Sequence, residues 1–380
     1  MDFAFTEEQE MLREQVRSFL AAEYPGERVA ELAESGDGWD EASWTKMAEL
    51  GWTGLSIPQQ YGGARDRRDD RDRTDGDENE GFLNEAVLFE ELGYGLYPGP
   101  YFATIALALP ALQSSPDMLA RVADGRARVT LAALEPDGAR SIEDPERINT
   151  TAEPDGEGWT LSGIKDLIVD LSAATHVVVS ARSDGDTGLW LVEPSPDATR
   201  SLETVDTTRR LGRLTLDSHP AALLVEPGGA APVLRNIRLR SQAALALEAV
   251  GVSQKVLELA REYTSERKQF DKPIGSYQAV SHQVADMYMH TELARSLAYW
   301  AAWCVATSDT SAPRAAASAA ALASESAVSA CEHSIQVHGG IGFTWEHILH
   351  RYYKRALGIA TFDGTAAKRR AAVAADLLDA

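Results

Sequence analysis

The sequence predicts an α+β protein with a helical N-terminal domain, a middle domain built as an antiparallel β-barrel, and a C-terminal four-helix bundle. Apolar residues recur at helical spacing from Phe5 to about residue 123, and again from about residue 234 to the end. Short β-rich runs fill the interval between them. The 380 residues exceed the ~250–300 at which single hydrophobic cores stop growing, so we expect two or three domains. We place them at residues 1–127, 128–233 and 234–380.

The N-terminal domain begins with an amphipathic segment, FTEEQEMLREQVRSFLAAEY. Its apolar face consists of Leu12, Val16, Phe19 and Leu20. Thr6, followed by acidic residues, is typical of a helix start. Further along, residues 64–81 read ARDRRDDRDRTDGDENEG and contain almost no apolar side chains. A stretch of mixed charge like this cannot bury itself, so we expect a surface loop there.

The middle domain is marked by a change of period. Its β-rich runs are VTLAAL, GWTLSGIKDLIV, THVVVSAR, TGLWLVE and AALLVE, and clusters of Gly, Asp, Pro and Ser separate them. Several short strands with turn signals and no helices between them predict an antiparallel sheet or barrel.

The last third of the chain has sustained helical spacing. Its three long segments are ALALEAVGVSQKVLELAREYTSERKQF, YQAVSHQVADMYMHTELARSLAYWAAWCVA and APRAAASAAALASESAVSACEHSIQVHGG. A glycine pair ends the last of them. Three or four such helices with short connections predict a bundle.

The composition argues against several classes of function. A formal net charge of −22 argues against nucleic acid as a main partner, because a surface that binds phosphates must be basic. No apolar run reaches the length of a membrane span, and the acidic, amphipathic N-terminus lacks the pattern of a secretion signal. Cys304 and Cys331 lie in Ala-rich helical segments and are expected to be small core residues. We therefore expect a cytoplasmic protein without a metal, membrane or nucleic-acid site.

Two dense motifs lie in the last third of the chain. Residues 266–287 read ERKQFDKPIGSYQAVSHQVADM, which is similar to the Arg-x-x-Phe-Gly-x-x-Ile…Gln…Ala-Asp-Met motif of the acyl-CoA dehydrogenases. Residues 336–356 read QVHGGIGFTWEHILHRYYKRA, which resembles the Gln-x-x-Gly-Gly-x-Gly-Phe segment of the same family. Weaker features extend the resemblance over essentially the whole chain. The stretch EELGYGLYPGPYFATIALALPAL resembles the heteromeric members found in actinobacterial steroid side-chain catabolism.

The resemblance implies that FAD lies across a subunit interface, where the neighbouring chain holds its pyrophosphate and adenine half. Arg267 would supply the fixed charge and the fork of donors that a diphosphate needs. Gln278 would hydrogen-bond nearby, and Phe270 would pack beside the cofactor.

The second motif would contribute Gln336 and the backbone at Gly339 and Gly340, where the absence of side chains lets a cofactor approach closely. Taken singly, Arg267 is equally well a surface arginine, and the glycine pair is equally well a helix end. Taken jointly, at the spacing of the family, these residues favour a cofactor site.

The reaction of this family removes two hydrogens across the Cα–Cβ bond of an acyl thioester, and a carboxylate takes the α-proton. Where relatives commonly have Tyr-Glu-Gly-Thr, this chain has FDGT, which puts Asp363 at the position of the base. Aspartate is one methylene shorter, and about 1 Å of misplacement can cost roughly 100-fold in rate. Asp363 is therefore either a re-spaced base or, as we favour, a loop aspartate. In other relatives the base stands where Ser241 lies, and Glu248, two turns further on, is interpreted as an interhelical carboxylate with catalysis as the alternative.

The residues with which a subunit of this family holds its own flavin and substrate are altered. LEPDGARSIED and KDLIVD stand where relatives have Thr-Glu-Pro…Gly-Ser and Lys-x-Trp-Ile-Thr around the flavin ring. Leu167 and Val169 would replace the tryptophan and the threonine. Gln242 aligns with the substrate-side arginine, and Ala366 and Ala367 stand where a glutamine often contacts the cofactor.

The altered and the retained residues divide by role. Residues that serve a subunit's own active site are lost, and residues lent to the neighbour's cofactor remain. This favours an FAD-dependent acyl-CoA dehydrogenase component that acts on an acyl-CoA, as the partner of a second, catalytic subunit in a heterotetramer. Electron-transfer flavoprotein is the expected electron acceptor. The alternatives are a self-sufficient homotetramer that uses Asp363, and a scaffold relative without flavin.

Overall fold

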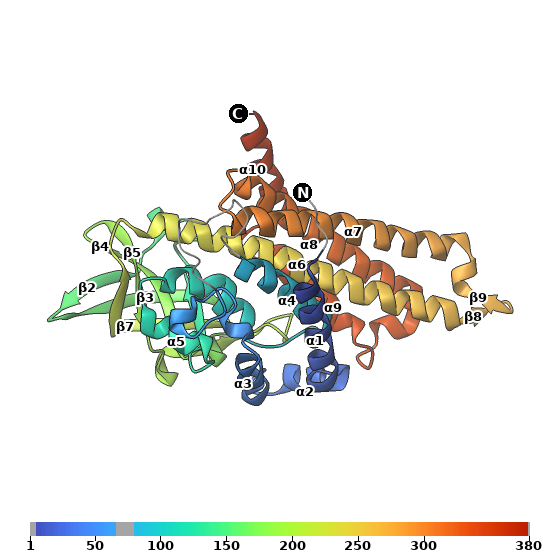
Figure 1. Cartoon of the computed structure of the whole chain (residues 1–380), viewed down its shortest axis with the longest axis horizontal. Coiled ribbons are helices and arrows are strands. Elements are labelled where there is room, and N and C mark those ends of the chain that lie inside the picture. Colours follow the sequence, from blue (N-terminus) through green and yellow to red (C-terminus); the bar gives the residue numbers. More distant parts are fainter. Residues whose placement is uncertain (1–4, 66–79, 379–380) are drawn as a thin grey trace. The chain divides into compact units, whose positions relative to one another are not determined.

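The computed structural model describes residues 5–65 and 80–378 (Figure 1). Its elements follow the predicted order of helices, strands and helices, which confirms the predicted fold class. Most of the charged stretch 64–81, predicted to be a surface loop, lies outside the described residues.

The chain divides into two compact units, each assembled from segments far apart in the sequence. The helical unit takes the described residues within Met1–Glu31, Leu83–Tyr97 and Gln242–Ala380. The β unit takes those within Leu32–Phe82 and Pro98–Ser241. Because the N-terminal segment contributes to both units, they do not test the limits of the three predicted domains, which stay a prediction.

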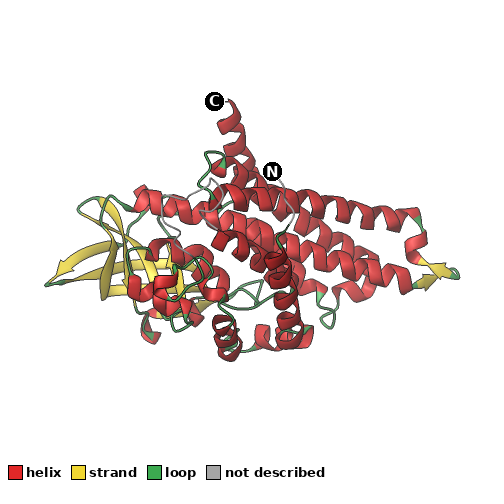
Figure 2. Cartoon of the chain, in the orientation of Figure 1, coloured by secondary structure: helices red, strands yellow, loops and turns green. Residues whose placement is uncertain are grey.

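The helical unit combines α1 (Glu7–Glu23) and most of α4 (Glu80–Tyr94) with the long helices that follow the strands (Figure 2). These are the greater part of α6 (Ala230–Glu266), α7 (Gln278–Ala306), α8 (Ala312–His338), α9 (Leu349–Thr361) and α10 (Ala366–Leu378). The short α2 (Gly26–Glu34) follows α1. The predicted helix start is confirmed, since the Thr6 hydroxyl accepts from the Gln9 backbone and the Gln9 side chain accepts from the Thr6 backbone.

Two glycines allow α4 and α6 to cross with their backbones in contact. A Cβ added to Gly93 would lie 2.2 Å from the carbonyl oxygen of Glu248, and one added to Gly251 would lie 1.9 Å from that of Glu90. Only glycine permits so close an approach. The same stretch of α4 also carries a buried carboxylate, Glu91, that pairs with Arg17 of α1 at 2.7 Å.

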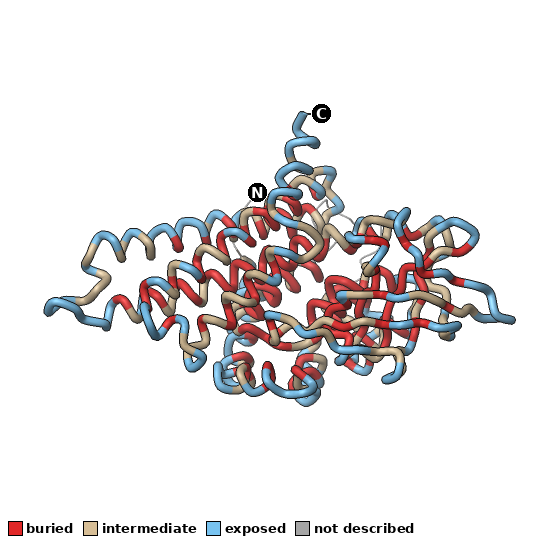
Figure 3. The backbone as a smooth tube through the Cα atoms, turned by 180° about the vertical axis from the view of Figure 1, so that it is seen from behind, coloured by how far each residue is buried: buried red, intermediate tan, exposed pale blue. Residues whose placement is uncertain are grey.

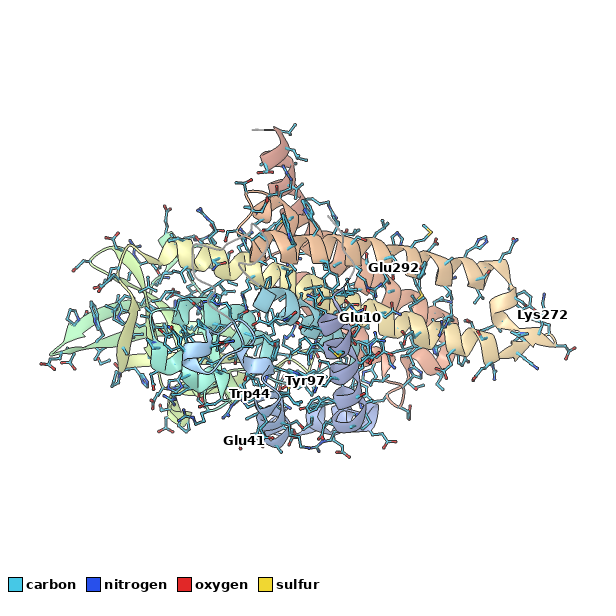
Figure 4. All side chains as sticks on the ribbon, viewed as in Figure 1. Glu10, Glu41, Trp44, Tyr97, Lys272 and Glu292 are labelled. Atoms are coloured by element: carbon cyan, nitrogen blue, oxygen red, sulfur yellow. The ribbon has the colours of Figure 1, made fainter. Side chains whose placement is uncertain are left out.

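A second arginine ties α7 to α4. The Arg295 Nε atom donates to Glu90 at 3.0 Å, and the same guanidinium pairs with Glu292 one turn earlier on α7 (Figure 4). The bundle is therefore joined by charge pairs on two buried carboxylates, Glu90 and Glu91, as well as by the alanine-rich buried face of α8.

The β unit contains α3 (Glu41–Glu49), α5 (Pro116–Ala123) and a closed barrel. Its strands are β1 (Val129–Ala132), β2 (Thr151–Asp155), β3 (Gly158–Val169), β4 (His176–Ser183), β5 (Asp186–Val192), β6 (Thr199–Leu202) and β7 (Leu211–Val225). Strands β4, β2, β3, β7 and β5 pair in that order, and β5 pairs back to β4, which closes the ring. β1 adds to β4 and β6 to β7. The predicted antiparallel pairing holds except at β1–β4 and β2–β4, which are parallel.

Cys304 and Cys331 are both buried, as expected for core residues. Within residues 5–65 and 80–378, no helix combines the length and the apolar content needed to cross a bilayer. The same residues bring together no group of three or more His, Cys, Asp or Glu side chains that could hold a metal ion.

A buried ion pair joins two segments of the β unit. They are the segments that the sequence analysis aligns with those around the flavin ring in relatives. Lys165 on β3 is fully buried, and its Nζ atom donates to Glu135 at 2.7 Å and to Ser180 at 3.2 Å. Glu135 also accepts from the backbone N–H groups of Asn149 and Thr150. The connection that follows β1 is therefore fixed to β3 even though the side chains expected to contact the ring have changed.

Replacing Lys165 with methionine should lower the free energy of unfolding by about 3–5 kcal/mol, because Glu135 would remain buried without its cation. Urea denaturation would measure this loss. The double variant Lys165→Met/Glu135→Gln should recover part of it, since no unpaired charge is then buried. A single variant as stable as the native chain would contradict this role.

Candidate functional site

The residues of the two sequence motifs meet at one end of the helical unit. α6 ends at Glu266, and a short hairpin follows, formed by β8 (Lys268–Gln269) and β9 (Lys272–Pro273). Arg267 is held between them, because its N–H donates to Tyr263 and its carbonyl accepts from the N–H of Ile274, both at 2.8 Å. Lys272 marks this hairpin in Figure 4.

The second motif supplies the end of α8 and the turn η9 (Gly339–Phe343). The N–H of Gly339 caps α8 by donating to the carbonyls of Ile335 and Gln336. Gly339 has a φ of 65°, in the left-handed region where glycine is favoured. Gly339 is therefore the cap of α8, as the simpler interpretation of the pair expects, and this leaves a binding role open.

Between these two motifs lies an open hollow of about 600 Å³. One wall is formed by Tyr263, Arg267, Gln269 and Ile274, and the other by residues 337–341. The size is ordinary for a ligand site, for which about 300–1,000 Å³ is typical. Arg267 is the only Lys or Arg among these described lining residues, so the hollow offers a fixed positive charge against glycine backbone.

The six predicted cofactor residues fall into two sets. Arg267, Gly339 and Gly340 line the hollow together. The lining does not include Phe270, Gln278 or Gln336. All six are exposed, and the hairpin is drawn largely as exposed backbone in Figure 3.

Phe270 is the most unusual of these residues. It is 87% exposed, and the backbone at Phe270 and Asp271 has φ angles of 52° and 64°. Left-handed backbone costs an L-residue about 1–2 kcal/mol, and such strain is often found at binding sites. No part of the described chain covers this ring, so it is available to a ligand or to a second chain.

Gly340 has no internal reason to be glycine. A Cβ added there would meet no described atom within 4 Å, and the φ angle is not left-handed. Gly342, two residues on, is different, since its Cβ would lie 2.7 Å from the carbonyl of Ile335. The space beside Gly340 is therefore open for something outside the described chain.

The sequence reasoning missed two aromatic residues of the hollow, Tyr263 and His338. Their rings stack at 4.4 Å between centroids with 23° between planes, and His347 lies 4.9 Å from His338. Burial lowers the pKa of His338, although a hydrogen bond to Ser334 opposes the shift. Their places in the sequence could have indicated them, since Tyr263 lies one helical turn before Arg267 and His338 directly precedes the glycine pair.

The candidate bases lie elsewhere in the chain. Asp363 is half-buried on the turn between α9 and α10, with a left-handed φ of 48°. The buried Arg369 holds that turn by donating to the carbonyl of Phe362 at 2.6 Å. Asp363 thus has the position of a turn residue, and its role as a base stays a hypothesis. Ser241 is fully buried and donates to the carbonyl of Arg238, one turn earlier on α6.

Glu248 is engaged in a buried ion pair within the helical unit. It is 3% exposed, and Nη1 of Arg355 on α9 donates to it at 2.6 Å. Arg355 itself is 1% exposed. A carboxylate tied in this way to an arginine is a poor proton acceptor, which favours the interhelical role.

In the β unit, the two residues expected to align with the flavin-ring contacts of relatives differ in exposure. Val169 is buried, whereas Leu167 is 48% exposed on an irregularity of β3 with a φ of 53°. Leu167 therefore presents an exposed aliphatic side chain, which offers no flat surface for stacking. In the helical unit, Gln242 is buried on α6.

Replacing Glu248 with glutamine should lower the free energy of unfolding by about 3–5 kcal/mol, because the change removes one charge of a buried ion pair with Arg355. Guanidinium denaturation would measure it. The exposed pair Arg370–Glu325 offers a matched control, for which Glu325→Gln should cost less than about 1 kcal/mol. If Glu248 were a catalytic base instead, its variant would fold normally and lose only activity.

Two family models match the chain. The C-terminal domain of the acyl-CoA dehydrogenases matches residues 238–378, and their N-terminal domain matches residues 6–114. With the similarity of whole chains described next, this shows that the protein belongs to the acyl-CoA dehydrogenase family, whose members are FAD-dependent oxidoreductases.

Among its relatives is the acyl-CoA dehydrogenase IpdE2 of Mycobacterium tuberculosis, which is 32% identical over 93% of this chain and 92% of its own. A solved structure of a variant of the Tcur3481-Tcur3483 steroid ACAD is 31% identical, with a TM-score of 0.82 over 98% of both chains. The ChsE4-ChsE5 complex of Mycobacterium tuberculosis is 25% identical, with a TM-score of 0.85 over 100% of both chains. These similarities confirm the predicted resemblance to steroid-type members.

Proposed function

We propose that this chain is the partner subunit of an FAD-dependent acyl-CoA dehydrogenase, and that it completes the FAD site of a separate catalytic chain. The observation that carries the proposal is the exposure of the retained motif residues. Arg267, Gly339 and Gly340 border a hollow open to solvent, and Phe270 is 87% exposed beside it on the hairpin. A ligand pocket normally buries about 70–90% of its ligand, so this half-site needs a second body to close it.

The residues of the hollow fit the diphosphate part of FAD. Arg267 provides a planar fork of donors, and Gln269 provides an amide beside it. Gly340 leaves open space where a side chain would stand, so an anion can approach the backbone. When bound, FAD supplies the hydride-accepting chemistry of the family.

The residues that would make the chain catalytic by itself do not support that role. Glu248 is paired with Arg355, and Ser241 lies at the other base position of the family. Asp363 is one methylene shorter than the glutamate of relatives. Leu167 offers no flat surface for a flavin ring. Each change concerns the chain's own active site, and none concerns the hollow.

For the substrate we propose an acyl-CoA thioester, and the similar structure named a steroid ACAD favours one that carries a steroid. The second subunit would be another chain of the same family that carries the missing glutamate. Electron-transfer flavoprotein would accept the electrons, and the assembly would be a cytoplasmic heterotetramer.

Replacing Gly340 with alanine should leave the fold intact and weaken flavin binding. The new methyl group would meet no described atom of this chain, so the free energy of unfolding should change by less than about 0.5 kcal/mol. In the complex with the catalytic chain, FAD affinity should fall about tenfold, or ~1.4 kcal/mol. Flavin absorbance per complex after dilution and gel filtration measures it.

Gly342→Ala is the matched control for that variant. Its Cβ would press on the Ile335 carbonyl at 2.7 Å, so it should lower stability. A Gly340→Ala complex that holds flavin as tightly as the native complex would argue against a cofactor at this backbone.

The deciding experiment is expression of the full chain alone and together with a family member encoded beside its gene. We expect little bound flavin and no acyl-CoA dehydrogenation from the chain alone, and both from the pair. Stoichiometric FAD with turnover by the chain alone would overturn the proposal, and loss of that turnover in Asp363→Asn would then assign the base. A pair that carries no flavin would instead indicate a scaffold role.

A further inference from the structure

His338 lines the hollow, and its ring contacts Tyr263 of the opposite wall. His338 is the last residue of α8 and is 5% exposed. It stacks on Tyr263 of α6 at 4.4 Å, and His347, just before α9, lies 4.9 Å away. Gly342 of η9 lies beside the base of this side chain, since an added Cβ would come within 3.1 Å of the His338 Cβ. Two segments of the helical unit therefore contact the ring, and a third lies beside its Cβ.

The hydrogen bond of His338 defines its tautomer. Nδ1 lies 2.7 Å from the carbonyl oxygen of Ser334, one turn back on α8. A carbonyl oxygen only accepts, so the proton of the neutral ring is on Nδ1. This bond fixes the plane of the imidazole relative to α8, and a ring with a fixed plane can set the distance to whatever stacks on it.

The stack is connected to Arg267 through the backbone. Tyr263 is one helical turn before Arg267, and its carbonyl accepts the Arg267 N–H at 2.8 Å. His338 is covalently joined to Gly339, which begins the opposite wall. A change in the Tyr263–His338 spacing would therefore change the gap between Arg267 and the glycine pair.

We propose that His338 is a positioning residue, whose ring acts as the spacer that holds Arg267 and the Gly339–Gly340 backbone at the separation that a diphosphate requires. This inference rests on the proposed function of the hollow as a half-site for FAD. It adds that affinity for the diphosphate depends on a stacked ring that does not itself neutralise the charge of the phosphates.

The test uses the complex of the full chain with its catalytic partner, stripped of flavin, and measures Kd by isothermal titration calorimetry, with ADP as the diphosphate probe and FAD in parallel. His338→Ala and Tyr263→Leu should each weaken ADP binding by about tenfold or more, because either change removes the stack. The double variant should lose little beyond the single ones, since both act on one contact. His338→Phe restores a flat ring but not the hydrogen bond to Ser334, so it should recover part of the affinity lost in His338→Ala.

His176→Ala is the matched control, because His176 is also a buried histidine but lies on β4 of the β unit and does not line the hollow. It should lower the thermal midpoint without changing ADP affinity. Native affinity in His338→Ala, no recovery in His338→Phe, or no ADP binding by the native complex would each overturn the proposal. If His338→Ala does not fold, native affinity in Tyr263→Leu overturns it. Turnover by the chain alone would end the partner-subunit proposal but leave this comparison intact, because affinity is its readout.

Discussion

The buried pair between Arg355 and Glu248 is the interaction on which the helical unit depends. Neither residue is more than 3% exposed, and the Nη1 donor lies 2.6 Å from its acceptor. Arg355 also donates to the carbonyl of Tyr97, and the Tyr352 hydroxyl donates to that of Tyr94. One face of α9 therefore binds both α6 and the end of α4. Since η9 leads into α9, this anchorage also supports the turn that carries the glycine pair.

The hollow at the end of this unit has an unusual combination of order and exposure. The cap at Gly339 and the hydrogen bonds of Arg267 fix the backbone of the hollow. Side chains on this backbone, among them that of Arg267 itself, are nevertheless exposed to solvent. The backbone at the exposed Phe270 is also strained, which adds to the free-energy cost of keeping this region ordered. An ordered but uncovered backbone agrees with the proposed half-site, in which a second chain would supply the rest of the desolvation.

The β unit presents the complementary case. The pair of Glu135 and Lys165 keeps the connection after β1 fixed to β3, so the framework around the aligned segments is retained. The outward residue Leu167 nevertheless offers no aromatic face. Buried charge pairs are costly to break, whereas a surface side chain changes at little cost to stability. The buried framework of an active site can therefore be retained when its exposed contact residues change. This agrees with the proposed subunit, which would keep the family fold without its own catalysis.

The sequence by itself determined the order of helices and strands, the family, and the two motifs, because hydrophobic period and dense local patterns are properties of consecutive residues. Only the tertiary structure decided which motif residues meet. It brought Arg267 to Gly339 and Gly340 and left Gln278 and Gln336 outside the lining. It also paired Glu248 with a distant arginine and closed the barrel by pairing β4 with both β2 and β5. The Tyr263–His338 stack joins residues far apart in the sequence, and no local pattern specifies such a contact, since helix packing alone sets their distance.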